Sequence, residues 1–500
     1  MESLQEAAAL PGSLAMHIDK EKEDAADAHS QACKRIPTLP EDIWHHIHSL
    51  MPLRDAARAA CLSRDFLRFW RCRPNLTLNL TTLGWTNKPG EFRCKIDSIL
   101  RNHPGIGLKT LQLDLLEDED EITFSDIDRW LQVARTPGIE ELILTLFANN
   151  YSSLYERQEE YSFPLSLLSD EKVRSSIRCL DLDSCAFRPT PQTIIGPLRS
   201  LTNLHLNSVR ITGDELECLL SNSLALKELH LFDCDEIVTF KIPPVLRQFR
   251  FLHVTECYEL TVIENRAPNL SVLEFSGDII GEISQVKNVR LMRSNVVHYA
   301  RVVLPSVMPN LEILRILSDS EEVNTPMLTT KFLYLRHLTF RLLSGSTFPP
   351  SYDYFLSLVS FLDASPSLET LYLEVRQGSV KSESVFRDSS TRLRQMPEHR
   401  HLCLKSVMME HFSSDKGLVE IACYILKNAV SLECMTLDTN YGPRCHGQRD
   451  KICLYMADSY LKDAPRAVAA IKSYINCNVP PSVKFTVLEP CTRCHVREAR

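Results

Sequence analysis

Apolar residues near the start of the chain are spaced as on amphipathic helices. Between residues 36 and 76, Ile43, Ile47 and Leu50 recur at i, i+4 and i+7, which predicts one apolar stripe along a helix that ends at Met51-Pro52-Leu53. A second apolar surface follows, made of Cys61, Leu62, Phe66, Phe69 and Trp70. A helical module of about 40 residues buries little surface, so this apolar face packs on the rest of the chain or belongs to a partner.

From about residue 108 the spacing changes to a recurring pattern, apolar-x-x-apolar-x-apolar. Alternation within each copy predicts a short strand with one face in a core. Between residues 177 and 335 the copies recur at intervals that cluster near a period of roughly 20–29 residues, which indicates stacked repeat units. The first positions of the copies are Leu108, Ile139, Ile177, Leu201, Leu226, Leu246, Leu270, Leu311, Leu335, Leu368 and Leu432, with a weaker copy at Val286.

One repeat unit shows how a strand and a helix alternate. Residues 201–206 form the expected strand, and Thr212 with Glu215 fits a capping box that opens a short helix. Asn222 is a plausible end of that helix, and Leu226 begins the next strand. Because one strand and one helix cannot bury their own apolar sides, the units must stack into a curved solenoid.

The helical module closely resembles the F-box over residues 37–74. The resemblance rests on Leu39-Pro40-Glu41-Asp42, on Ile43, Ile47 and Leu50, on Pro52-Leu53-x-Asp55, and on Leu62-Ser63-Arg64 followed by an aromatic residue. The chain departs from the family in one place: F-boxes usually carry Val-Ser-x-x-Trp, whereas Trp70 stands further along the chain. The register of the third helix is therefore open.

The repeats resemble leucine-rich repeats of irregular type. The Asn/Cys slot that usually ends the strand segment is filled at Cys185, Cys234 and Asn440. Residues 397–438 carry a His401–Val407 strand, a helix that follows Asp415 and a further strand, and they are similar to the C-terminal end of plant F-box/leucine-rich-repeat proteins. The expected fold is an α/β repeat, in which a three-helix F-box precedes an irregular leucine-rich-repeat solenoid.

These patterns divide the chain into five segments. We expect a disordered tail because residues 1–34 are charged and rich in alanine. The tail after the repeats contains an expected helix over 451–475 and a possible strand over 483–488. The segments are 1–34 disordered tail, 36–76 F-box, 77–107 linker, 108–440 solenoid, and 441–500 C-terminal helix, strand and tail.

Composition limits the class of partner and the compartment. A hydrophobic content of 44% supports a large core, and the formal net charge of −8 comes without a basic stripe, so nucleic acid is not expected as a partner. No signal peptide or membrane-length apolar run is visible, and the 17 cysteines are scattered along the chain. We expect reduced thiols in the nucleus, the cytoplasm or both, and no membrane partner.

Several polar clusters could bind a metal or haem, but each also has a simpler structural explanation. Cys491-Thr-Arg-Cys494-His495 has the spacing of a haem attachment site, and with Cys445-His446 it could form a zinc site, but a surface tail is the simpler interpretation. His45 and His48 are expected to be partly exposed beside the apolar stripe, and residues 117–121 to form a solvated acidic loop. We expect neither a metal nor a cofactor.

No Gly-rich phosphate loop, Gly-x-Ser-x-Gly elbow or His-Glu-x-x-His motif occurs, and only 15 glycines are present. The sequence therefore predicts no catalytic residues. The resemblance instead implies a non-catalytic substrate receptor of a Skp–cullin–F-box ubiquitin ligase, in which other subunits transfer ubiquitin. The F-box would bind a Skp-type adaptor, and through it a cullin, while the repeats bind an unidentified target protein.

The resemblance also implies which residues contact the adaptor: Leu39, Pro40, Ile43, Ile47, Leu50, Pro52, Leu53, Leu62, Ser63 and Trp70. The target would meet strand positions outside the core, such as Thr202, Asn203, His205, Lys227, Glu228 and His230. The alternative is a leucine-rich-repeat scaffold whose F-box-like segment only caps the solenoid. The two hypotheses differ in whether the chain covers Ile43, Ile47 and Leu50 with its own residues.

Overall fold

The computed structural model falls into two compact units, Met1–Arg210 and Ile211–Arg500. The predicted tail 1–34, the acidic run 117–121 and the residues Cys445, His446, Cys494 and His495 lie outside the described residues. The structure describes residues 40–84, 90–104, 106–115, 122–146, 160–191, 196–276, 283, 285–319, 329–343, 358–376, 384–386, 393–394, 396, 398–440, 456 and 458–491.

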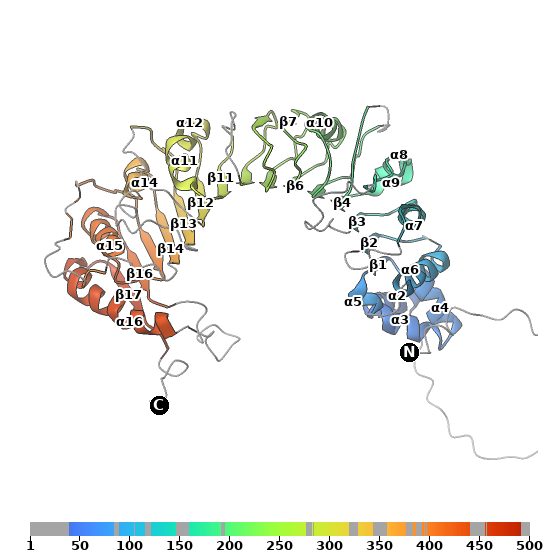
Figure 1. Cartoon of the computed structure of the whole chain (residues 1–500), viewed down its shortest axis with the longest axis horizontal. Coiled ribbons are helices and arrows are strands. Elements are labelled where there is room, and N and C mark those ends of the chain that lie inside the picture. The colour runs from blue at the N-terminus through green and yellow to red at the C-terminus, as the bar shows by residue number, and fades with distance from the viewer. Residues whose placement is uncertain are drawn as a thin grey trace, which may run out of the picture. The chain divides into compact units, whose positions relative to one another are not determined.

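The first unit begins with three helices and continues as strands that alternate with helices (Figure 1). Its helices are α2 (Glu41–Leu50), α3 (Leu53–Ala60), α4 (Arg64–Arg71), α5 (Leu80–Leu83), α6 (Glu91–Asn102), α7 (Phe124–Leu131), the 3-10 turn η1 (Gln132–Ala134), α8 (Ser166–Ser169) and α9 (Glu171–Ser176). Its strands are β1 (Asn75–Leu78), β2 (Thr110–Asp114), β3 (Glu141–Thr145), β4 (Cys179–Asp183) and β5 (Asn203–Asn207).

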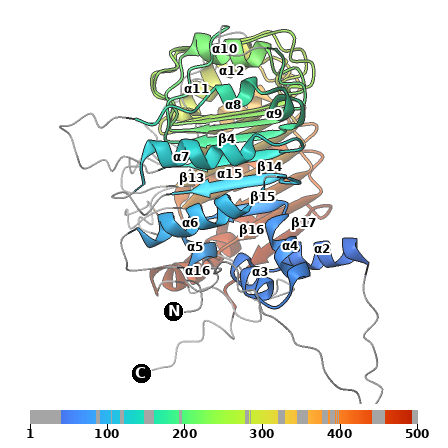
Figure 2. The ribbon, with the colours of Figure 1, turned by 90° about the vertical axis from the view of Figure 1, so that its right-hand side faces the viewer.

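The strands of the first unit form a parallel ladder in chain order. Leu111 lies opposite Leu142, and Leu142 opposite Leu180, so the predicted apolar positions line up from repeat to repeat. These leucines are fully buried, while helices α6, α7 and α8 lie on one side of the strands (Figures 1 and 2). We use the term strand face for the side of each ladder that points away from its helices.

The described part of 77–107, expected to be a linker, contains the end of β1 and the helices α5 and α6. Strand β1 pairs in parallel with β2, so the ladder begins before residue 108. Helix α6 follows and buries Phe92, Ile96 and Leu100. The sequence pattern missed this first repeat because β1 is only four residues long and has a single short apolar alternation, Leu76 and Leu78.

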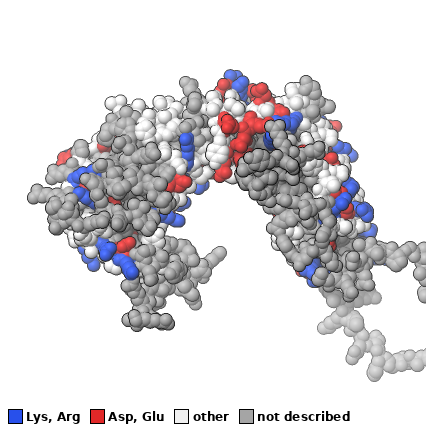
Figure 3. Space-filling model, viewed as in Figure 1, with Lys and Arg blue, Asp and Glu red and all other residues white. Residues whose placement is uncertain are grey.

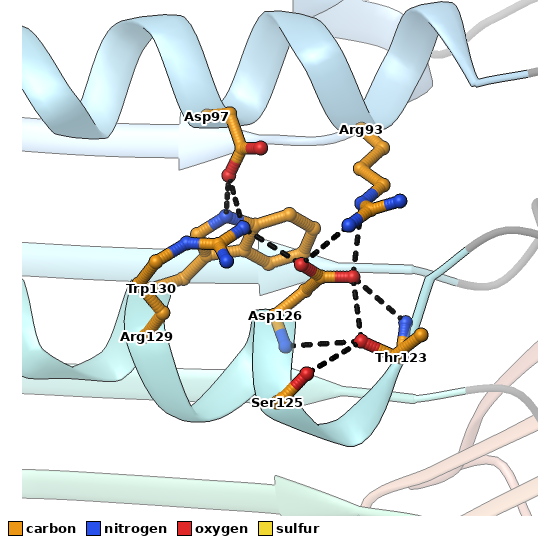
Figure 4. A network of polar contacts seen from close by, with 7 residues as sticks. All are labelled: Arg93, Asp97, Thr123, Ser125, Asp126, Arg129 and Trp130. Carbon is orange, nitrogen blue, oxygen red and sulfur yellow. Dashed lines mark hydrogen bonds and ion pairs between the residues drawn. The ribbon is translucent and has the colours of Figure 1, made fainter.

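A polar network fixes α7 against α6 (Figure 4). The carboxylate of Asp126 is almost fully buried, and Thr123 caps α7 while the Asp126 side chain accepts from the Thr123 amide in return. Arg93 of α6 donates to Asp126 Oδ1 at 2.9 Å, and Arg129 donates to the same atom at 2.7 Å. Arg129 also reaches Asp97 of α6, which ties the two helices together.

The second unit has the same strand-and-helix order. Its helices are α10 (Gly213–Ser221), α11 (Val296–Val302), α12 (Leu304–Val307), α14 (Val359–Ala364), α15 (Lys416–Asn428), α16 (Asp458–Ala470), the π-helical turn η2 (Ile471–Ile475) and the 3-10 turn η3 (Asn476–Asn478). Its strands are β6 (Glu228–Phe232), β7 (Thr239–Ile242), β8 (Phe251–Thr255), β9 (Val262–Asn265), β10 (Val272–Phe275), β11 (Asn288–Met292), β12 (Ile313–Ser318), β13 (His337–Leu343), β14 (Thr370–Arg376), β15 (Ser406–Glu410), β16 (Cys434–Asp438) and β17 (Lys484–Leu488).

The ladder of the second unit runs from β6 through β8 and β10 to β17, all in parallel. Helices α11, α12, α14 and α15 lie on one side of it (Figure 1). The predicted capping box of Thr212 and Glu215 is confirmed at the start of α10, and Asn222 ends that helix. In two adjacent repeats the short strands β7 and β9 pair with each other instead of forming helices.

Two predicted strand registers are wrong. The copy assigned to Leu246 begins at Phe249, because Leu252 and Val254 lie opposite the leucines of β6. Leu246, Phe249 and Leu252 recur every third residue, so the apolar pattern fits either frame. The strand expected over His401–Val407 begins at Ser406, and the residues before it form turns.

The C-terminal part extends the ladder beyond residue 440. Strand β17 pairs in parallel with β16, which places Phe485 opposite Met435. The helix expected over 451–475 begins later than predicted, since Met456 is not helical, and α16 runs from Asp458 and continues through η2. Among the described residues, no helix has both the length and the apolar character needed to span a membrane.

Candidate docking surfaces

Helices α2, α3 and α4 form a module that has a small core of its own. Leu53, Ala56 and Phe69 are buried, and the Phe66 and Phe69 rings lie 6.5 Å apart. Ser63 caps α4 by accepting a hydrogen bond from the Phe66 amide at 3.1 Å. The prediction that His48 is partly exposed is wrong, since its side chain is buried and its ring lies 6.2 Å from that of Phe69.

The apolar stripe of this module is exposed. Ile43 is 40% exposed, Ile47 38% and Leu50 72%, and Leu62, in the turn before α4, is 79% exposed. Ile43, Ile47 and Leu50 come from α2, which buries only His48 among its described residues. Exposed aliphatic side chains grouped on one small module are typical of a surface that a partner covers.

The other predicted adaptor contacts have different positions. Pro40 and Pro52 precede α2 and α3 and are exposed, whereas Leu53 is only 6% exposed because it belongs to the core of the module. Ser63 is the cap of α4, and Trp70 lies half-buried in the last turn of that helix. Leu39 lies outside the described residues.

Arg73, which the sequence pattern did not single out, joins the module to the ladder. Its buried guanidinium donates to three main-chain carbonyls at the end of α2: His48 at 3.0 Å, Ser49 at 3.2 Å and Met51 at 2.6 Å. Its Nε donates to the carbonyl of Asn75, the first residue of β1. The fork thus supplies donors to helix-end carbonyls, of which that of His48 also accepts from the Met51 amide, and it fixes α2 to the first strand.

The strand face of the first unit carries acidic side chains. Burial raises the pKa of Asp183, and the charges of Asp181 and Asp114 add to the rise, while hydrogen bonds from Ser184 and Asn207 offset part of it. The predicted contact residues Asn203 and His205 lie on the same face of β5, outside the core. The face therefore offers carboxylates and amides to a bound partner.

The strand face of the second unit begins with an aromatic group. The rings of His230 and Phe251 lie 5.1 Å apart, and those of His230 and His253 5.4 Å apart. His253 Nδ1 also lies 3.1 Å from Glu274. Figure 3 shows acidic side chains in the region where α10, β6 and β7 are labelled in Figure 1, and the turns after β6 and β8 supply Asp235, Glu256 and Glu259 to the exposed surface.

Further along the same strand face, side chains pair with one another. Arg341 and Arg376 both contact the buried carboxylate of Glu374, at 3.1 Å and 2.7 Å. The Arg341 guanidinium also lies over the ring of Tyr372. Of the predicted Cys491, Cys494 and His495 cluster, only Cys491 is among the described residues.

Two protein-family models match this chain. The model described as At1g61320/AtMIF1, LRR domain, matches residues 99–492, and the F-box domain model matches residues 36–77. An F-box/FBD/LRR-repeat protein of Arabidopsis thaliana is 24% identical over 80% of this chain and 88% of its own length. An FBD-associated F-box protein of the same plant is 25% identical over 81% of this chain and 93% of its own length.

Proposed function

This chain belongs to the plant F-box/leucine-rich-repeat proteins, and from that premise we propose that it is the substrate-recognition subunit of a cullin-type E3 ubiquitin ligase. F-box proteins with leucine-rich repeats serve generally as substrate receptors and are typically non-catalytic adaptors. In the proposed complex α2–α4 bind a Skp-type adaptor, the adaptor binds a cullin, and the strand faces hold a target protein. Ubiquitin transfer belongs to the other subunits.

The observation that carries the proposal is the exposed stripe on α2. Ile43, Ile47, Leu50 and Leu62 are exposed on a module whose own core is already formed by other residues. Fully burying an exposed Leu or Ile side chain contributes about 1.5–3 kcal/mol, and Leu50 and Leu62 have the most exposed surface to bury in an interface. A segment that only capped the solenoid would turn its apolar side chains inward, so their exposure favours an adaptor over the capped scaffold.

The target-binding role rests on the strand faces. Their side chains are polar and aromatic, with histidines on both ladders, and they suit a protein surface better than a small apolar ligand. The described cysteines are free thiols, which supports a place in the reducing nucleus or cytoplasm. No described helix is long and apolar enough for a membrane, and we propose no membrane or nucleic-acid partner.

Replacing Ile47 by aspartate is expected to abolish binding of the full-length chain to a Skp-type adaptor. An unpaired carboxylate buried in the interface costs about 3–5 kcal/mol, which corresponds to at least about a 100-fold loss of affinity. Binding can be measured by calorimetry or by pull-down of the purified chain with the adaptor. Leu50→Asp is expected to have the same effect.

Ile106→Asp is the matched control. Ile106 is 70% exposed in the same unit but lies outside α2–α4, so its replacement should leave adaptor binding unchanged. Circular dichroism should show native secondary structure for all variants, because the replaced side chains are exposed. Full adaptor binding by both Ile47→Asp and Leu50→Asp would rule out the proposed interface, and absence of binding by the unchanged chain would favour the capped scaffold.

A further inference from the structure

A cluster of two histidines and an aspartate in the second unit has no part in the proposed function. Asp363 comes from α14, and His399 and His401 flank Arg400 in the turn before β15. One ligand atom of each residue lies within 4.8 Å of the others, and Asp363 Oδ1 is 3.6 Å from His401 Nε2. Imidazole and carboxylate together are the ligand set that zinc and similar cations prefer.

We propose that Asp363, His399 and His401 form a site for a divalent transition-metal cation such as Zn²⁺. Tetrahedral coordination with metal–ligand bonds of about 2.0–2.2 Å places ligand atoms roughly 3.3 Å apart. The pair of Asp363 and His401 is already close to that separation. His399 is exposed, so its ring can move the remaining distance without disturbing the core, and water completes the coordination.

The main chain holds the histidines in place before a metal binds. His401 donates from its amide to the Asn428 carbonyl at 2.9 Å and accepts from the Val430 amide at 3.2 Å. The amide of His399 donates to the Asn428 side chain at 3.1 Å. The turn is therefore fixed to the end of α15, and little conformational freedom is lost when the ligands close on a cation.

The hydroxyl of Tyr424, on α15, orients the carboxylate of Asp363. It donates to Asp363 Oδ1 at 2.7 Å and lies 3.1 Å from His401 Nε2. Since the hydroxyl proton points to Asp363, Nε2 carries the proton in this arrangement, and metal binding requires the tautomer with the proton on Nδ1.

Arg301 is the neighbouring cation: burial lowers its pKa, and the charge of Asp363 partly opposes that effect. Its guanidinium donates to the carbonyls of Ser360 and Thr330, both at 3.1 Å. A second grouping, Glu374 with Glu410 and His411, is a poorer site because Arg341 and Arg376 already neutralise Glu374. The Asp363 cluster is therefore the better candidate, because it joins two imidazoles to one carboxylate.

Cobalt(II) titration of the chelator-treated full-length chain tests the proposal. Unchanged protein should bind one equivalent with the absorption of nitrogen and oxygen ligands, and His399→Ala should lose that equivalent. Because His399 is exposed, this variant keeps its fold. Tyr424→Phe should weaken cobalt binding about 10-fold or more, as expected for loss of an orienting partner. Zinc should raise the melting temperature of unchanged protein but not of His399→Ala.

Two further variants separate this site from others in the chain. His298→Ala replaces an exposed histidine of α11 and should bind cobalt as the unchanged chain does. Cys491→Ser combined with Cys494→Ser should also retain the equivalent. The proposal is overturned if His399→Ala binds cobalt with unchanged stoichiometry and affinity, or if the equivalent disappears only in the cysteine variant.

Discussion

Replacing Arg73 by methionine is expected to destabilise the first unit by about 3 kcal/mol, because each buried carbonyl that loses its donor costs about 1–3 kcal/mol. The carbonyls of Ser49 and Met51 lose the guanidinium, and that of His48 retains the Met51 amide as a donor. Methionine has a similar length, so packing changes less than hydrogen bonding. Urea unfolding of the full-length chain, followed by circular dichroism, measures the loss.

Arg71→Met is the control for this effect. Arg71 is an exposed residue of α4, two positions before Arg73, and its replacement should change stability by less than about 0.5 kcal/mol. Arg73→Met should also weaken adaptor binding, although no residue of the exposed stripe is altered, because α2 loses its attachment to β1. Equal stability of the two variants would contradict the role that we assign to Arg73.

The sequence predicted the parts of this protein that depend on periodic spacing. The apolar stripe of α2 and the stacked strands follow from i, i+4 and alternating patterns, and the capping box of Thr212 and Glu215 is a local motif. Periodicity alone does not say which apolar side faces inward. Leu50 and Leu53 are near neighbours in sequence, yet one is 72% exposed and the other buried, since α2 ends at Leu50 and α3 begins at Leu53.

Contacts between residues far apart in the chain could not be predicted, because they leave no recurring pattern in the sequence. Arg73 meets carbonyls more than twenty positions earlier, and main-chain carbonyls carry no residue signature. Asp363 reaches His401 only after α14 and the turn before β15 are stacked. The register of β8 failed for a different reason, because a threefold apolar spacing supports two frames and only pairing with β6 decides between them.

The contacts of Arg73 and β1 explain how the module formed by α2, α3 and α4 is held against the first strands. The proposed adaptor surface consists of exposed side chains on a small module, and such a module gains little rigidity from its own core. The bonds from Arg73 and the pairing of β1 with β2 attach the module to the parallel ladder of the first unit. A stable attachment of this kind would fix the orientation of the adaptor relative to the first strands.

The network around Asp126 should make the first unit sensitive to acid. Burial alone would raise the pKa of Asp126, but hydrogen bonds from Thr123, Arg93 and Arg129 outweigh it and lower the pKa to about 2. The folded pKa lies below the unfolded value of 3.8, so the stabilisation is present above pH 3.8 and is lost as the pH falls from there through about 2. The difference corresponds to about 2 kcal/mol.

Asp126→Ala is therefore expected to lower the free energy of unfolding by about 2–4 kcal/mol at pH 7, through loss of both the ion pairs and the capping box. The gap between this variant and the unchanged chain should narrow as the pH is lowered from about 4 toward 2, because the unfolded chain takes up a proton on Asp126 before the folded chain does. Asp65→Ala is the matched control: Asp65 also lies in the first turn of a helix, but it is exposed. A gap that stays constant with pH would mean that packing, and not the charge of Asp126, stabilises α7 on α6.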